Sequence, residues 1–358
     1  MKIAMIGHKQ IPGRSGGVEV VVEELATRMA QEHDVTVYNR KNGEEQPSEY
    51  KGVKINKTFT INKKSLDALI YSFVASLKVL FKKYDVIHYH ALGPSVMLLI
   101  PKLFKRKTKI VATVHGLDWQ RAKWGGFGTK YLKFGEKVIA KHADEVIVLS
   151  KNMQQYFLDN YNRQTTYIPN GIPENKKLKP NLILDKYGLT EQSYILFLSR
   201  IVPEKGLHYL IDAYNQLNTD KKLVIAGASS NTNEYYNSIV EKAKDNPNII
   251  MTGFVSGDLL NELYTNAAVF VLPSEVEGMP LVLLEAMSYD IPILASNIPE
   301  NTEIIGKENT FITQNVPDLK KRLEEILSLQ EIPTINKDKY DWDKITLQTL
   351  ETYTRKET

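Results

Sequence analysis

Short apolar runs alternate along this chain with longer amphipathic stretches, and the two patterns predict different elements. The apolar runs are rich in Val and Ile and only a few residues long, which is typical of strands buried on both faces of a sheet. We predict strands at Ile3–Ile6, Val35–Tyr38, Val86–His90, Ile110–Val114, Val146–Leu149, Thr166–Ile168, Tyr194–Ser199, Leu223–Ala226, Ile249–Thr252, Val269–Pro273, Pro292–Ala295 and Thr310–Ile312.

The stretches between these runs repeat apolar residues at helical spacing. We predict helices at Val18–Met29, Leu66–Phe81, Thr129–His142, Asn152–Tyr161, Leu207–Leu217, Glu234–Lys244, Leu259–Asn266, Leu281–Tyr289 and Asp318–Leu329. Asp341 is suited to cap one further helix that continues through Tyr353. Strands that alternate with helices in this way indicate an α/β fold with parallel sheets.

The chain has 358 residues, which is enough for two domains. The turn-forming sequence Asn170-Gly171-Ile172-Pro173 and the Lys- and Pro-rich segment after it suggest the boundary. We therefore predict two tandem Rossmann-like, doubly wound domains over residues 1–170 and 183–340, joined by a linker over residues 171–182. Helix 341–358 is expected to return to the first domain. Ligands of such folds bind at the carboxyl ends of strands, so the site is expected in a cleft where the domains face each other.

The net charge of +4 is the sum of two unlike parts. Residues 1–170 hold 27 Lys and Arg against 15 Asp and Glu, and the remainder holds 19 against 27, so the parts carry +12 and −8. The chain has no cysteine, which excludes disulfides and thiolate-bound metals. Its first apolar run is too short for a signal peptide, and no run is long enough to span a membrane, so we expect a cytoplasmic protein.

The loop after the first predicted strand ends in Gly16 and Gly17, directly before a predicted helix. Glycines let backbone approach a ligand closely, and the free N–H groups of a helix N-terminus attract phosphate. The spacing is not that of a dinucleotide-binding Gly-x-Gly-x-x-Gly motif, and the chain has no P-loop sequence. Taken alone, this loop sequence fits a phosphate site and a plain strand-to-helix turn equally well.

Two cations, Arg200 and Lys205, follow the first predicted strand of the second domain. Pro203 and Gly206 shape the loop that carries them, and a predicted helix follows directly. Cations at the carboxyl end of a strand can neutralise a diphosphate, so we favour this interpretation over a solvated charged loop.

Glu277 and Glu285 frame an apolar block behind the predicted strand Val269–Pro273. Pro280 suits the first turn of a helix, which places Glu277 in a loop and Glu285 within the helix. Carboxylates accept hydrogen bonds from sugar hydroxyls, and the N–H groups at a helix start suit a phosphate. Taken alone, these residues favour the plainer alternative of two surface glutamates.

Histidines stand at the ends of two predicted strands. His115 follows Ile110–Val114 and is close in sequence to Asp118, and this pair of residue types suits proton transfer or the binding of hydroxyl groups. His88 and His90 share one face of their strand, but no third ligand for a metal is evident. A packed or hydrogen-bonded pair is therefore favoured over a metal site.

Together these motifs resemble the retaining glycosyltransferases of family 4, whose two facing Rossmann-like domains form the GT-B architecture. The resemblance covers nearly the whole chain and is carried by Gly16-Gly17-Val18-Glu19, Thr113-Val114-His115-Gly116, Ile168-Pro169-Asn170-Gly171, Arg200-x4-Lys205-Gly206, Pro273-Ser274-x2-Glu277-Gly278-x6-Glu285-Ala286 and the helix with Trp342. The opening stretch through Tyr38-Asn39-Arg40 looks most like bacterial envelope-polysaccharide enzymes of this family.

The resemblance implies roles for the site residues. Arg200 and Lys205 would hold the diphosphate of a nucleotide-sugar donor and stabilise the leaving group. Glu277 and His115 would contact the transferred sugar, and Glu285 the ribose hydroxyls. The whole donor site would comprise Gly16, Gly17, Arg200, Lys205, Glu277, Gly278, Met279, Pro280, Leu281 and Glu285. His90 and Asp118 are the candidates for acceptor binding.

The resemblance also implies that neither a metal nor a cofactor is needed, because cations and a helix dipole take the place of a metal. Asp341-Trp342-Asp343 is similar to the Asp-x-Asp metal motif of some sugar transferases, but it does not follow an apolar strand, so we predict no metal site. The segment Ser296–Asn301 stands where relatives often have an Asp and glycines, which leaves the donor sugar open. The path by which configuration is retained is open as well.

Two lysine-rich segments account for much of the positive charge. An apolar predicted helix lies between Lys63-Lys64 and Lys82-Lys83, and Pro101–Lys109 holds five more cations. Anionic lipid headgroups attract each such cation by about 1 kcal/mol, so we favour docking at the inner face of the plasma membrane over a plain core helix. No aromatic platform or known module points to nucleic acid.

Three functions fit these observations. We favour a hexosyltransferase-type glycosyltransferase that uses a lipid-linked or polysaccharide acceptor in the synthesis of envelope or capsule glycans. A sugar-nucleotide epimerase on the same double-Rossmann plan is the main alternative, and it would need no acceptor. A two-lobed binding protein is the third, but exported proteins of that kind carry a signal peptide.

Overall fold

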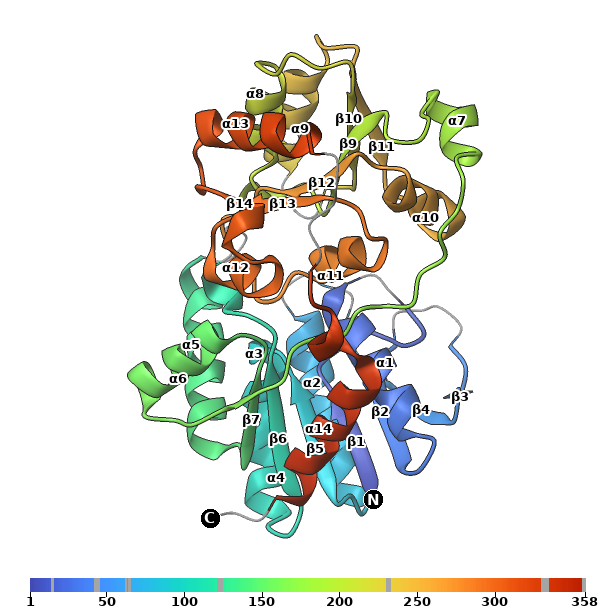
Figure 1. Cartoon of the computed structure of the whole chain (residues 1–358). Coiled ribbons are helices and arrows are strands. Elements are labelled where there is room, and N and C mark those ends of the chain that lie inside the picture. The colour runs from blue at the N-terminus through green and yellow to red at the C-terminus, as the bar shows by residue number, and fades with distance from the viewer. Residues whose placement is uncertain are drawn as a thin grey trace. The chain divides into compact units, whose positions relative to one another are not determined.

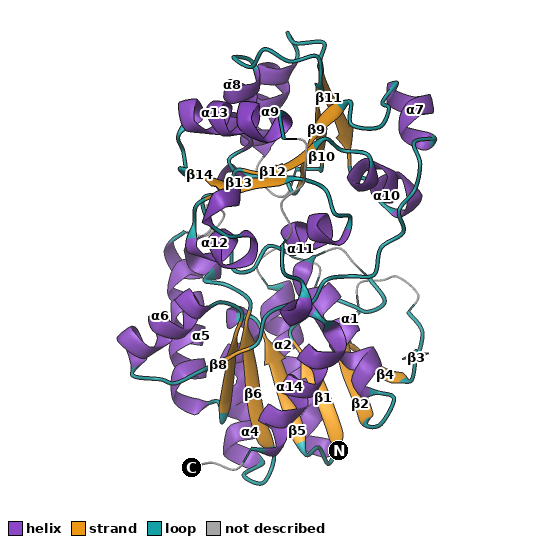
Figure 2. Ribbon diagram, in the orientation of Figure 1, coloured by secondary structure: helices purple, strands orange, loops and turns teal. Residues whose placement is uncertain are grey.

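The computed structural model describes residues 1–13, 16–41, 46–61, 63, 66–120, 125–229, 233–329 and 335–355. The chain divides into two compact units (Figure 1). The N-terminal unit comprises Met1–Gln120, Trp124–Gly171 and Lys339–Thr358, and the C-terminal unit comprises Ile172–Asp338. The α/β class predicted from the sequence is confirmed, because each unit has one mainly parallel sheet with helices packed against it (Figure 2).

In the described residues, the sheet of the N-terminal unit has eight strands in the order β3-β4-β2-β1-β5-β6-β7-β8. The strands are β1 (Lys2–Ile6), β2 (Asp34–Arg40), β3 (Glu49–Tyr50), β4 (Val53–Thr58), β5 (Val86–His90), β6 (Lys109–Val114), β7 (Glu145–Val148) and β8 (Thr166–Tyr167). All neighbours are parallel except β3 and β4. Strands β2, β3 and β4 lie on one side of β1 in the sheet, and strands β5 to β8 lie on the other side. The topological switch point, where such sheets bind ligands, therefore lies between β1 and β5.

Helices cover both faces of this sheet. They are α1 (Gly17–Met29), α2 (Asp67–Lys78), α3 (Leu92–Ser95), α4 (Leu99–Phe104), α5 (Gly126–His142), α6 (Lys151–Tyr161) and α14 (Trp342–Thr354), with short 3-10 turns η1 (Val79–Phe81), η2 (Val96–Leu98) and η3 (Asp118–Gln120). Alternate residues of β1 belong to separate cores. Ala4 and Ile6 pack with residues of α2, α3, α5 and α6, whereas Ile3 and Met5 pack with residues of α1 and α14.

The sheet of the C-terminal unit has six parallel strands among the described residues, in the order β11-β10-β9-β12-β13-β14. The strands are β9 (Tyr194–Leu198), β10 (Lys222–Ala226), β11 (Ile249–Gly253), β12 (Val269–Leu272), β13 (Ile293–Ser296) and β14 (Thr310–Phe311). The helices are α7 (Leu182–Tyr187), α8 (Leu207–Tyr214), α9 (Asn233–Ala243), α10 (Gly257–Thr265), α11 (Leu281–Ser288), α12 (Pro299–Ile305) and α13 (Val316–Leu327), with 3-10 turns η4 (Pro203–Lys205), η5 (Lys307–Asn309) and η6 (Asp338–Tyr340). The switch point lies between β9 and β12, the two strands that lead to Arg200 and Glu277.

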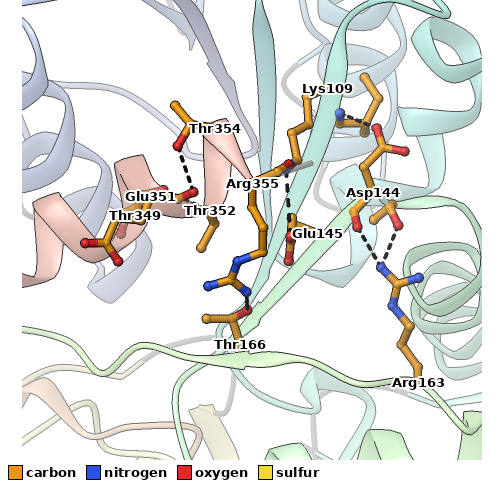
Figure 3. Close-up of polar contacts among 12 residues, drawn as sticks. Lys109, Asp144, Glu145, Arg163, Thr166, Thr349, Glu351, Thr352, Thr354 and Arg355 are labelled. Carbon is orange, nitrogen blue, oxygen red and sulfur yellow. Dashed lines mark hydrogen bonds and ion pairs between the residues drawn. The ribbon is translucent and has the colours of Figure 1, made fainter. Parts of the chain in front are cut away.

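Helix α14 packs on the N-terminal unit beside α1. Asp341 caps it by accepting a hydrogen bond from a backbone N–H of the first turn (2.8 Å), which confirms the predicted cap. The Trp342 ring lies against Gly171, where a Cβ would be 2.5 Å from a ring carbon. At the other end Arg355 donates to the Thr166 hydroxyl (3.3 Å; Figure 3). The helix is thus attached to the sheet at both of its ends.

The segment predicted as a linker lies along the C-terminal unit. The Glu262 carboxylate accepts hydrogen bonds from the N–H groups of Asn181 and Ile183, both 3.0 Å. Lys177 pairs with Asp290 (2.8 Å). The N-terminal unit breaks off at Gly171 and resumes at Lys339, so the segment that follows Gly171 belongs to the C-terminal unit and packs on it.

Candidate functional site

A close backbone contact in the C-terminal unit joins the loop after β9 to the loop after β12. Gly206 precedes α8 with a φ of 64°, a conformation that favours glycine. A Cβ at Gly206 would lie 2.1 Å from the carbonyl oxygen of Pro273, so no larger residue fits. This contact sets Lys205 beside Glu277.

Lys205 and Glu277 form an ion pair between Nζ and Oε1. Each side chain is only 9% exposed. Removing such ions from water costs several kcal/mol each, and an apolar pair of similar size often gives a more stable protein. A buried ion pair at the carboxyl edge of the sheet therefore points to a functional role more than to stability.

Arg200 follows β9 on the same loop, but its side chain is exposed. The loop is held close to the next strand by Gly227, where a Cβ would lie 1.9 Å from the Ser199 carbonyl oxygen. The two predicted cations thus share one edge of the sheet in different environments. Lys205 is buried and paired with Glu277, whereas Arg200 is an exposed residue.

The block after Glu277 leads directly into α11. Gly278, Met279 and Pro280 are buried, and the helix begins at Leu281 with Pro280 as its N-cap. The sequence predicted Pro280 one position further on, within the first turn. The free N–H groups at the start of α11 therefore come immediately after the loop that holds Glu277, and such groups attract phosphate oxygens.

Glu285 lies half-buried on α11. The Tyr264 hydroxyl donates to Glu285 Oε2 (3.0 Å), and the Tyr264 ring stacks on Tyr289 with 5.0 Å between centroids. Burial, together with the Glu285 charge, raises the pKa of Tyr264 well above its usual range, so the phenol keeps its proton and acts as the donor. The Glu285 carboxylate is therefore held in one orientation, as binding of a pair of hydroxyls requires.

The segment Ser296–Asn301 forms a buried polar junction. Ser296 Oγ donates to the Ser274 carbonyl, and Asn301 Nδ2 donates to Ser296 O (3.1 Å) and Oγ (3.0 Å). All three residues are fully buried. The unusual residues of this segment therefore join the ends of β12 and β13 to the start of α12.

In the N-terminal unit, Gly16 and Gly17 open α1. A Cβ at Gly16 would lie 2.6 Å from Glu19 Oε2. Glu19 and Glu23, on the first turns of the helix, accept hydrogen bonds from N–H groups of the preceding loop (2.9 and 3.2 Å). Carboxylates in this position repel phosphate, so the geometry favours a turn stabilised by glutamates over a phosphate site here.

Three neighbouring strands of the N-terminal sheet lead to histidines. His8 follows β1, His90 ends β5 and His115 follows β6. His90 Nδ1 lies 3.1 Å from His115 Nε2. His88 packs on His90 with 4.1 Å between ring centroids, which confirms the predicted pair. Sequence reasoning missed His8, although it is the first polar residue after a buried strand, as His115 is.

Asp118 is half-buried at the start of η3 and belongs to the same edge of the sheet as His115. In the described part of the chain, no three His, Cys, Asp or Glu residues are grouped as metal ligands. Asp341 caps α14, and Asp343 pairs with Arg28 (2.8 Å). The two aspartates of the Asp-x-Asp sequence therefore hold α14 in place, Asp341 as its N-cap and Asp343 through an ion pair with α1.

The two lysine-rich segments meet at the amino end of the N-terminal sheet, where Lys105 Nζ donates to the Lys82 carbonyl (2.5 Å). Not all of the predicted cluster is available to a partner. Lys102 pairs with Asp144, and Lys109 lies 3.7 Å from a Glu145 oxygen (Figure 3). The exposed cations here include Lys82, Lys83, Arg106 and Lys107, and Lys64 lies outside the described residues.

Apolar side chains are exposed beside these cations. Helix α2 turns Tyr71 and small or hydroxyl side chains towards the core and leaves Phe73 and Leu77 at the surface. Phe81 is 89% exposed and Phe104 is 69% exposed. None of the described helices is both long and apolar enough to cross a membrane. Helix α2 therefore packs against the core with one face and exposes apolar side chains on the other.

Two family models together match almost the whole chain. The model described as Glycosyltransferase Family 4 matches residues 15–176, and that described as Glycosyl transferases group 1 matches residues 182–339. The chain belongs to the family 4 glycosyltransferases. The two matches divide where the two units divide, so the glycosyltransferase has one family module in each unit.

Known glycosyltransferases resemble this one along most of their length. The uncharacterized glycosyltransferase MJ1178 of Methanocaldococcus jannaschii is 25% identical and covers 94% of both chains. The UDP-Gal:alpha-D-GlcNAc-diphosphoundecaprenol alpha-1,3-galactosyltransferase of Escherichia coli is 26% identical over 74% of this chain and 71% of its own. Anabaena Alr3699/HepE in complex with UDP and glucose has a TM-score of 0.79 at 19% identity, over 98% of this chain and 99% of that chain. The structural likeness confirms the GT-B fold.

Proposed function

We propose that this glycosyltransferase transfers a sugar from a nucleotide-diphosphate sugar to a lipid-linked or polysaccharide acceptor, with retention of configuration and without a metal, in cell-envelope glycan synthesis. The observation that carries the proposal is the buried Lys205–Glu277 pair at the switch point of the C-terminal sheet. A buried cation and carboxylate followed by a helix N-terminus can bind a diphosphate together with the sugar attached to it.

Each donor residue has a chemical task in this proposal. Lys205 and Arg200 neutralise the diphosphate as its bond to the sugar breaks, and the N–H groups of α11 add to that positive field. Glu277 accepts hydrogen bonds from the transferred sugar. Glu285, held by Tyr264, accepts hydrogen bonds from the ribose. Because the protein supplies this positive charge itself, the leaving group needs no divalent cation.

The relatives support the proposed substrates. The Escherichia coli relative is named for the transfer of galactose from UDP-Gal to GlcNAc-diphosphoundecaprenol, and HepE was solved with UDP and glucose. Both the named relatives and the family models are those of glycosyltransferases, which gives the epimerase alternative no support.

The test is turnover of a panel of nucleotide sugars with undecaprenyl-diphosphate-linked sugar acceptors. We expect one donor to be consumed only when acceptor is present, at the same rate with and without EDTA. NMR of the product is expected to show the anomeric configuration of the donor. Isomerisation of donor alone would indicate an epimerase, and an inverted product or a loss of activity in EDTA would contradict the proposed mechanism.

We also propose that the N-terminal unit docks on anionic membrane through the outer face of α2, η1 and the end of α4. The argument is the combination of exposed Phe73, Phe81 and Phe104 with exposed cations at Lys82 and Lys83. Aromatic side chains partition into the headgroup region, and lysines beside them are attracted by anionic lipid. This surface could bring the unit to a lipid-linked acceptor.

Flotation with phosphatidylglycerol-containing vesicles tests this docking. We expect the double variant Phe81→Ser/Phe104→Ser to bind at least about tenfold more weakly, because two apolar anchors are lost. Binding of the unaltered protein is expected to weaken in high salt. The control is Leu347→Ser, which alters an exposed residue of α14 on the opposite face of the sheet. Equal binding of the double variant, or equal binding to neutral vesicles, would contradict the docking surface.

A further inference from the structure

A row of histidines lies along the carboxyl edge of the N-terminal sheet. His8, His88 and His90 are fully buried, and His115 is half-buried at the end of the row. The family resemblance gives His115 a contact with the transferred sugar, whereas His90, which the sequence suggested for acceptor binding, is fully buried and does not face solvent. The buried members are uncharged in the fold, because burial lowers the pKa of His8 to about 4 and of His88 to about 3 and holds the pKa of His90 well below its usual range.

His88 is fixed by a hydrogen bond at each ring nitrogen. Its Nδ1 lies 2.7 Å from the Tyr353 hydroxyl of α14, and its Nε2 lies 2.7 Å from Thr113 Oγ1 on β6. Burial raises the pKa of Tyr353 above its usual range, so the phenol keeps its hydrogen and is able to donate it. Neutral His88 has a single N–H, so it donates to one of these two hydroxyls and accepts from the other, and the ring is held in one orientation.

His90 lies between this anchored ring and His115. Its Nδ1 faces His115 Nε2 at 3.1 Å, whereas its own Nε2 has no hydrogen-bond partner within the described residues. A buried N–H without an acceptor is rarer in proteins than a buried lone pair without a donor. The hydrogen of His90 is therefore assigned to Nδ1, from which it is donated to His115 Nε2.

The other group that faces His90 does not disturb this assignment. His8, on the loop after β1, contributes to the electrostatic environment of His90. The Asn39 side chain is oriented by the Ile11 backbone, since its Oδ1 accepts from the Ile11 N–H (3.1 Å) and its Nδ2 donates to the Ile11 carbonyl (2.8 Å). The same Oδ1 lies 2.9 Å from His8 Nε2, so His8 is a neutral Nε2–H imidazole.

We propose that His90 is a positioning residue which holds His115 in one ring orientation as the Nδ1–H tautomer, and that His88, tied to Tyr353 of α14, supports His90 in turn. Because the Nδ1–H of His90 donates to Nε2 of His115, that nitrogen must carry a lone pair, and the single hydrogen of neutral His115 is then on its Nδ1. The consequence for catalysis rests on the proposed function and on the contact with the transferred sugar that the family resemblance implies for His115. The tautomer itself does not depend on it.

The first experiment measures the tautomer in the full-length protein without substrate. Ring ¹⁵N chemical shifts of His115 distinguish a protonated Nδ1 from a protonated Nε2, and loss of signals in His115→Gln assigns them. In His90→Asn the amide nitrogen takes the place of Nδ1 and can still donate, whereas in His90→Leu the donor is gone. We expect the Nδ1–H form of His115 in the unaltered protein and in His90→Asn, and a mixture of forms in His90→Leu. Unchanged His115 shifts in His90→Leu would overturn the proposal.

The second experiment measures sugar transfer in the same variants. We expect His90→Leu to lower kcat by about 10- to 100-fold and His90→Asn to restore most of it, since an outer hydrogen-bond partner typically has this effect on activity. Tyr353→Phe should act in the same direction more weakly, and Tyr84→Phe, which removes a buried hydroxyl bonded to Tyr38 (3.0 Å), should not change kcat. A stable His90→Leu protein with unaltered kcat would refute a role in catalysis. A shifted tautomer with full activity of His115→Gln would instead refute the role of His115 in the proposed function.

Discussion

Replacing Lys205 with Met is expected to lower kcat/KM for sugar transfer by about 100- to 1,000-fold. Methionine keeps the length and the apolar stem of lysine but removes the positive charge that meets the diphosphate as the bond to the sugar breaks. Because the Lys205 side chain is only 9% exposed, solvent cannot substitute for that charge. The measurement is steady-state transfer with varied donor. The loss should fall mainly in kcat, since negative charge on the leaving group develops in the transition state.

Loss of Lys205 also leaves Glu277 as a buried, unpaired charge, which costs about 3–5 kcal/mol of stability. The double variant Lys205→Met/Glu277→Gln removes both charges and should regain much of that stability in urea denaturation while it stays inactive. Lys242→Met is the matched control, because Lys242 pairs with Asp212 at the surface of the same unit. A double variant with normal kcat/KM would contradict the role given to the pair.

Replacing Trp342 with Ala is expected to lower the free energy of unfolding by about 3–5 kcal/mol. The side chain is 4% exposed, lies in the core shared by α1 and α14 and fills the space above Gly171. Leu347→Ala is the control on the same helix, and we expect it to change stability by less than about 0.5 kcal/mol because its side chain is 61% exposed. Urea unfolding followed by circular dichroism measures both. A loss below about 1 kcal/mol for Trp342→Ala would mean that the ring is not part of a tightly packed core.

The strands of the two sheets were predictable because a buried parallel strand appears in the sequence as an apolar run. Val86–His90 was predicted with the bounds that the structure has. The strand Val53–Thr58 was missed, because it alternates buried and exposed residues and carries lysines near the edge of the sheet. The helices within Leu92–Phe104 were also missed, since they are short and Pro94 and Pro101 interrupt the helical pattern.

The site residues were predictable as residue types at the carboxyl ends of strands, but their contacts were not. Lys205 and Glu277 are 72 positions apart, and they meet because Gly206 lets one loop touch the carbonyl of Pro273. The hydrogen bond between His90 and His115 likewise depends on two neighbouring strands ending at the same level. No local period in the sequence encodes such contacts. They follow from strand order, which is a property of the whole sheet.

The N-terminal unit obtains α14 from a part of the chain that lies beyond the entire C-terminal unit. On a ribosome, Trp342 and Tyr353 therefore emerge only after every strand of both sheets has been made. Until then Gly171 lacks the ring that covers it, and His88 lacks the Tyr353 hydroxyl that is its hydrogen-bond partner. A nascent chain would thus have every strand of the C-terminal sheet before the histidine row of the N-terminal unit is supported.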